Sequence, residues 1–270
     1  MKIEKITMLV TAKTYPTISS RYNETVCTAG ITKNGLLRRL YPICYRSLPK
    51  SEKFSKYQWI SCDAIRDIRD PRDESYKLIG KIQPLDIITT KQEWDQRRKV
   101  VLPNVQFDLQ QIIKLAYDPN EWKSLFMFKP AKIIKFNVID CSFSEKINRK
   151  KEILLHSLNI GKSLVEDIPY KFSYTFVDYA GKVSTLQLLD WEIYQLTRKL
   201  IRVHKNNFSA IASALKNKYF DDIACKRDVY FFLGSNRYWH IRKSKNPFMI
   251  IGLFYPPKLN NPTNLVELTN

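Results

Sequence analysis

The sequence has little of what marks several common classes of protein. Its 270 residues contain only 7 glycines, which argues against a linker-rich or low-complexity chain. It has no phosphate-binding glycine loop, and its serine, histidine and aspartate residues do not fall at spacings that suggest a hydrolase triad. Hydrophobic residues make up 44% of the chain, enough for a full core in one large domain or two ordinary ones. We therefore expect the chain to fold throughout.

Cysteine and histidine are sparse and scattered. There are 3 histidines, and the 5 cysteines form no CxxC pair and no Cys/His pair at metal-ligand spacing. The cysteines are Cys27, Cys44, Cys62, Cys141 and Cys225. We predict reduced thiols in the core and no cofactor.

Long hydrophobic runs are also missing. The N-terminal residues lack the uninterrupted apolar segment of a signal peptide, and the run from Phe248 to Tyr255 is too short to span a bilayer. These two absences predict a cytoplasmic protein with no membrane partner.

Acidic residues are the minority among the charged ones. The chain has 45 Lys and Arg against 26 Asp and Glu, a net charge of +19. Both ends contribute, with 16 cations and 9 anions in residues 1–90 and 15 cations and 7 anions in residues 170–270. Such an excess favours an anionic partner, either nucleic acid or an acidic protein. The alternative is that an AT-rich genome raises the lysine content without any ligand.

Hydrophobic periodicity and turn residues predict an α+β fold in three regions. Residues 1–83 form a basic antiparallel sheet or barrel of roughly four strands, residues 84–128 a helical bridging segment, and residues 129–270 a mixed α+β region. Within the first, Asn34-Gly35 predicts a hairpin with a type I′ turn. Expected elements of the third are a strand at 132–140, a helix at 145–158, a hairpin at 170–189, helices at 191–203 and 208–220, and strands at 229–233 and 248–255.

Four aromatic residues alternate along the first strand of the hairpin at 170–189. They are Tyr170, Phe172, Tyr174 and Phe176. Alternation places them on one face, which is either a core face or a base-stacking platform. We favour the core, because four exposed aromatic side chains would promote aggregation.

The loop 235–247 between the last two strands is basic and aromatic and contains no carboxylate. Its residues of interest are Arg237, Tyr238, Trp239, Arg242, Lys243 and Lys245. Guanidinium and ammonium groups bind phosphate, and aromatic faces stack on bases, so the loop suits a nucleic acid. The alternative is a solvated basic loop in which Trp239 packs onto the core.

A second basic surface is predicted in the N-terminal region, among several tyrosines. Its cations are Arg21, Arg38, Arg39 and Arg46. Small barrels often bind single-stranded nucleic acid, an analogy of fold that carries little weight alone.

Two acidic groups raise the question of catalysis. Asp190 and Glu192 flank Trp191 at a change from strand to helix, where they could bind Mg²⁺ or Mn²⁺ in a nuclease. Position 194 is Tyr, however, where restriction-type nucleases need Lys, and an N-cap role for Asp190 is the simpler interpretation. The denser acidic group at residues 63–74 alternates with arginines, which favours mutual pairing.

The sequence therefore predicts a nucleic-acid-binding protein that grips the phosphate backbone through the two basic, aromatic surfaces. One alternative is a metal-dependent nuclease, or another nucleic-acid-processing enzyme, that uses Asp190 and Glu192. The other is a basic subunit that docks on an acidic protein or nucleoprotein assembly. The choice between DNA and RNA stays open.

Overall fold

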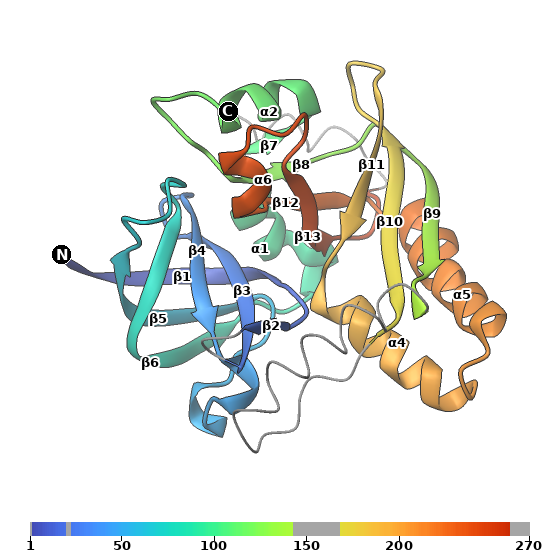
Figure 1. Cartoon of the computed structure of the whole chain (residues 1–270), viewed down its shortest axis with the longest axis horizontal. Coiled ribbons are helices and arrows are strands. Elements are labelled where there is room, and N and C mark those ends of the chain that lie inside the picture. The colour runs from blue at the N-terminus through green and yellow to red at the C-terminus, as the bar shows by residue number, and fades with distance from the viewer. Residues whose placement is uncertain (1, 20–22, 143–167, 260–270) are drawn as a thin grey trace.

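The predicted α+β fold is confirmed by the computed structural model, which describes residues 2–19, 23–142 and 168–259. A closed five-stranded barrel is followed by helices and a mixed seven-stranded sheet (Figure 1). Among the described residues, no helix is long and apolar enough to cross a bilayer.

The barrel forms because each of its strands pairs on both sides. Its strands are β1 (Ile3–Lys13), β3 (Asn23–Thr32), β4 (Leu37–Ile43), β5 (Gln58–Arg66) and β6 (Ser75–Ile87). They follow the order β1-β5-β6-β4-β3, and pairing of β1 with β3 closes the ring, with β2 (Thr17–Ser19) added beside β3. Two 3-10 turns, η1 (Tyr45–Ser47) and η2 (Lys50–Glu52), lie between β4 and β5. Closure leaves no open edge within the ring.

Sequence reasoning missed β6 as a strand. Gly80 has a positive φ of 75°, and the pairing of β5 with β6 shifts register beside it, between Cys62 and Asp63. A glycine at such an irregularity interrupts the alternation by which a strand is recognised in sequence.

The predicted hairpin at Asn34-Gly35 joins β3 to β4, but the expected type I′ turn is wrong. Of these two residues, only Gly35 has a positive φ, of 78°. The Gly35 amide donates to the Thr32 carbonyl at 3.0 Å, and the Thr32 amide donates to the Leu36 carbonyl at 2.9 Å. This is a three-residue loop in which glycine takes the left-handed position after the turn.

The second sheet is mixed, with the order β7-β8-β12-β13-β11-β10-β9. Its strands are β7 (Val105–Gln106), β8 (Leu125–Phe128), β9 (Lys132–Asp140), β10 (Tyr170–Val177), β11 (Val183–Leu188), β12 (Tyr230–Ser235) and β13 (Phe248–Phe254). The predicted hairpin at 170–189 is β10 and β11, and its four aromatic side chains are buried, so the core interpretation is confirmed. The predicted helix at 145–158 lies outside the described residues.

The helices connect and cover the sheet. They are α1 (Lys91–Val101), α2 (Leu109–Ala116), α4 (Trp191–Val203), α5 (Phe208–Lys216) with its π-helical continuation η3 (Asn217–Ala224), and the short α6 (Arg237–Ile241). Ile193 of α4 and Ile211 of α5 are buried in one cluster with Phe172 and Tyr174, which places both helices against the aromatic face. Asp108 caps α2 and Asp190 caps α4, each by accepting from backbone amides, and the cap at Asp190 is as predicted.

The segment 84–128, predicted as a helical bridge, is divided between the two halves of the molecule. Val101 of α1 packs in a cluster shared by both halves, while β7 and β8 pair within the second sheet. The shared cluster brings Leu9 of β1 against Ile251 and Phe254 of β13. The barrel and the sheet therefore pack through a common apolar core.

Candidate functional site

A cleft of about 830 Å³ opens between the barrel and the second sheet. Pockets that bind small ligands have volumes of roughly 300–1,000 Å³. The lining comes from both halves of the molecule. The barrel side contributes β2, β3, β4 and the loops after β1 and β5, and the sheet side contributes the end of β11, α4, β13 and the segment from β12 into α6. It includes Thr14, Tyr15, Cys27, Arg39, Tyr41, Asp67, Arg69, Asp70, Arg72, Leu189, Tyr194, Asn236, Arg237, Tyr238 and Arg242.

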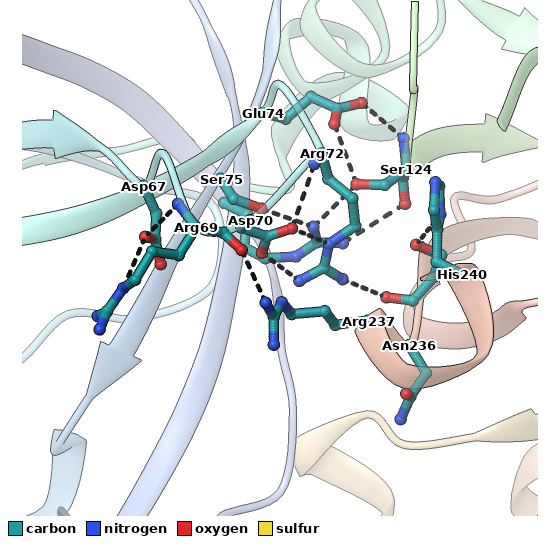
Figure 2. A network of polar contacts seen from close by, with 12 residues as sticks. Asp67, Arg69, Asp70, Arg72, Glu74, Ser75, Ser124, Asn236, Arg237 and His240 are labelled. Carbon is teal, nitrogen blue, oxygen red and sulfur yellow. Dashed lines mark hydrogen bonds and ion pairs between the residues drawn. The ribbon is translucent and has the colours of Figure 1, made fainter. Parts of the chain in front are cut away.

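Arg72 and Asp70 form a buried ion pair at this cleft (Figure 2). Arg72 Nε donates to Asp70 Oδ1 at 2.8 Å, and Arg72 Nη1 donates to the Ser235 carbonyl at 2.7 Å. Burial alone would raise the pKa of Asp70, but the hydrogen bonds and charge of Arg72 lower it to about 2. The pair therefore stays charged and ties the loop before β6 to the end of β12.

Arg39 belongs to the same network and is only 3% exposed. Its Nη1 donates to Ser75 Oγ at 3.1 Å and to Ser124 Oγ at 2.8 Å. Glu74 accepts from the Ser124 hydroxyl at 3.0 Å and from the Ser124 amide at 2.8 Å. Two buried arginines are thus balanced by two buried carboxylates, and the base of the cleft has no excess charge.

The rim carries the excess of positive charge. Arg69 is exposed, and Arg237 Nη2 donates to its carbonyl at 2.7 Å (Figure 2). The Arg242 guanidinium lies 3.8 Å from the centroid of the Tyr238 ring. Within the part of the chain that the structure describes, neither Arg237 nor Arg242 pairs with a carboxylate. These two cations remain available to an anion.

His240 holds α6 in place beneath this rim. It is fully buried between the rings of Tyr117 and Trp122, each 5.4 Å away by centroid, and its Nδ1 lies 2.9 Å from Ser235 Oγ. Burial, with the charges of Arg72 and Arg39, lowers the pKa of His240 to about 4, so the ring is neutral at pH 7. At the start of the helix, the Asn236 side chain accepts from the amides of Tyr238 and Trp239.

The two halves of the molecule match two families. The family described as a domain of unknown function, DUF8758, matches residues 4–103, and the one described as a domain of unknown function, DUF8757, matches residues 105–269. The chain belongs to the DUF8757 family. None of the curated proteins matches the chain. The DUF8758 match spans the barrel and α1, and the DUF8757 match spans the second sheet, so the cleft lies where the two matched regions meet.

The predicted loop 235–247 of the DUF8757 region supplies Arg237, Tyr238 and Arg242 to the cleft. Trp239 is 50% exposed and contacts the Tyr238 ring edge to face at a centroid distance of 4.8 Å, so its alternative interpretation as a core residue is wrong. Lys243 and Lys245 are exposed on the same loop without lining the cleft.

Of the arginines predicted in the N-terminal region, the three that the structure describes are not brought together. Arg39 lies in the buried network, while Arg38 lies near the Tyr76 ring, 5.5 Å from its centroid. Arg46 pairs with Glu24 at 3.0 Å, and Arg21 is outside the described residues. The structure adds Arg69 and Arg72, which the sequence showed only as members of an acidic and basic run. Pairing within that run is confirmed by the Arg66–Asp73 and Arg72–Asp70 contacts.

Asp190 and Glu192, the predicted nuclease carboxylates, both contact the buried Lys56. Lys56 Nζ lies 2.9 Å from Asp190 Oδ2 and 3.3 Å from Glu192 Oε2, and the Leu253 amide also donates to Asp190 at 3.0 Å. Burial raises the pKa of Asp190. Across residues 2–19, 23–142 and 168–259, no three His, Cys, Asp or Glu side chains are grouped to share a metal ion. Catalysis by Asp190 and Glu192 stays a prediction.

The five cysteines are free thiols, but their expected location in the core is only partly correct. Cys62 and Cys141 are buried, Cys27 and Cys44 are half-buried, and Cys225 is exposed.

Proposed function

We propose that the protein binds single-stranded nucleic acid across the cleft between the barrel and the second sheet. The observation that carries the proposal is the convergence of Arg69, Arg237 and Arg242 with the exposed ring of Tyr238 at one rim.

The arginines have the chemistry of phosphate contacts. A guanidinium donates through a rigid planar fork that matches phosphate oxygens, and it does so best when no carboxylate competes for it. Arg237 and Arg242 have no carboxylate partner in the described residues, and they lie at the start of α6 and at its C-cap. Both line the same cleft.

The aromatic residues favour a single strand over a duplex. Tyr238 and Trp239 are each 50% exposed beside the rim arginines. In a duplex the base faces are already stacked, whereas an unpaired base offers its face to an aromatic ring. The combination of cations and half-exposed rings therefore supports an unpaired strand of DNA or RNA.

Contacts within the protein hold the rim without any ligand. His240 and Asn236 hold α6, and the Arg72–Asp70 pair holds the facing loop through Ser235. A preorganised site loses less conformational entropy on binding than a mobile loop would.

Titration of labelled single-stranded DNA and RNA against rising salt tests the proposal. We expect Arg237→Ala and Arg242→Ala each to lower affinity and to reduce the salt dependence by roughly one phosphate contact. Lys226→Ala is the control, because Lys226 is an exposed cation that does not line the cleft. Absence of binding to either strand at low salt would refute the proposal.

Replacing Tyr238 separates this function from docking on an acidic protein. Base stacking on an aromatic ring contributes about 1–3 kcal/mol, so we expect Tyr238→Ala to weaken strand binding as much as loss of an arginine does. An acidic protein partner would depend on the arginines and tolerate Tyr238→Ala.

A further inference from the structure

Resting on the proposed function, we infer that the cleft receives one unstacked nucleotide of the bound strand, with its base inside and its phosphates at the rim. The ligand is then a strand end or a looped-out nucleotide, and a fully paired duplex is excluded from the site.

The distribution of charge matches the two parts of a nucleotide. At the base of the cleft, Arg72 is neutralised by Asp70, and Arg39 lies in the network that includes Glu74. At the rim, Arg237 and Arg242 lack acidic partners within the described residues. An uncharged nucleobase would therefore lie in an interior whose charges are balanced. The negatively charged phosphates would lie at the rim, where the positive charges are not neutralised.

The walls of the cleft include aromatic side chains. Tyr15 and Tyr194 line it and stack on each other, with centroids 4.5 Å apart and planes inclined by 14°, and Tyr194 is 8% exposed, so this pair forms an apolar wall. Tyr41, from the barrel, also lines it and is 41% exposed. Aromatic and apolar walls of this kind hold extruded bases in other proteins.

The cleft is large enough for one nucleotide. A volume of about 830 Å³ is of the order that encloses a drug-sized ligand, which a nucleotide is. A base pair kept in its duplex stack cannot enter such a volume, so an internal nucleotide must first unstack. Binding should therefore favour sites where unstacking is already complete.

Cys27 provides a probe inside the cleft, and Cys225 provides a matched thiol outside it. We expect a saturating single strand to slow alkylation of Cys27 by iodoacetamide about tenfold or more, because the base covers the thiol, while alkylation of Cys225 is unchanged. The Cys27→Ser protein identifies which product belongs to Cys27. If the strand binds and the Cys27 rate does not change, the inference is wrong while the proposed function stands. If no strand binds at all, the proposed function itself fails.

The affinities of a bulged duplex and a fully paired duplex provide a second measurement that does not depend on the thiol. We expect a duplex with one bulged nucleotide to bind about tenfold more tightly than the same duplex fully paired, because unstacking takes a few kcal/mol. Equal affinities would overturn the inference. Adenosine and thymidine monophosphates provide a third measurement. Protection of Cys27 by a monophosphate at a concentration below the millimolar range would assign the site to free nucleotides. Protection by single strands alone would assign it to nucleic acid.

Discussion

The arginines of the barrel region and the arginines at α6 differ in whether a carboxylate neutralises their charge. On β4, Arg39 is buried in a network that contains Glu74, and beyond β4 Arg46 pairs with Glu24. At the start of α6, Arg237 contacts a carbonyl, and Arg242 at its C-cap contacts an aromatic ring, with no carboxylate partner among the residues described. Similar cationic sequences thus have different roles: the β4 arginine stabilises the junction of barrel and sheet, and the α6 arginines remain available to an anion.

The largest expected effect is the loss of folding stability when the buried Arg39 is replaced. Arg39→Met leaves Glu74 and Asp70 buried with one cation fewer, and we expect it to lower the free energy of unfolding by about 3–5 kcal/mol. Arg38→Met, at the next residue of β4, should lower it by about 1 kcal/mol or less, because Arg38 is only half-buried. Urea unfolding of the two variants makes the comparison. Equal losses would show that burial of Arg39 does not distinguish it from its neighbour.

The second prediction concerns pH and the support beneath α6. Burial, with Arg72 and Arg39, lowers the pKa of His240 from 6.5 to about 4, partly offset by Asp70. Between these values the unfolded chain binds a proton that the folded protein excludes, so folded stability decreases as the pH falls from about 6.5 towards 4. The loss should reach about 3 kcal/mol at pH 4.

Unfolding measured from pH 7 to pH 4 on the wild type and on His240→Asn tests this effect. The variant should lose less stability across that window, because its side chain does not titrate. Parallel curves for the two proteins would contradict a buried neutral histidine.

The third prediction compares the two surfaces in binding. Arg242→Ala should lower affinity for a single strand by about fivefold, the loss of roughly one charge-assisted contact of about 1 kcal/mol. Arg46→Ala should change affinity by less than about twofold, because Glu24 already neutralises that charge. Titrations of both variants with a single strand at one low salt concentration measure the two affinities. A larger effect of Arg46→Ala would restore the barrel surface as the binding face.

The smallest effect on stability is expected at Trp239. Its half-exposed ring leaves little cavity when removed, so Trp239→Ala should lower the free energy of unfolding by about 1 kcal/mol or less. Phe54→Ala is the matched contrast, because Phe54 is 2% exposed and its loss should be about 3–5 kcal/mol. Thermal melting of both variants makes the measurement, and a comparable loss at Trp239 would show that its ring belongs to the core.

Much of the local structure could be predicted, and the site only in part. Alternation identified β10 and its aromatic face, and the side-chain chemistry of Asp190 identified the start of α4. The loop 235–247 was predicted as a binding surface, and three of the six residues singled out in it line the cleft. Arg69 and Arg72 could not be singled out, because nothing within their own segment distinguishes a rim arginine from a buried one.

The amino-acid sequence by itself determined most of the strands, the positions of two hairpins, the helix cap at Asp190 and the charge of +19, because each follows from neighbours a few residues apart or from composition. Tertiary structure alone decided which charges are free. Alternation places Arg38 and Arg39 on opposite faces of β4, and the buried Arg39 contacts Ser75 and Ser124, which are 36 and 85 residues away. At the cleft, Arg72 likewise contacts Ser235, 163 residues away. Burial and pairing set the free energy of a charge, and both depend on contacts between segments that the chain brings together only on folding.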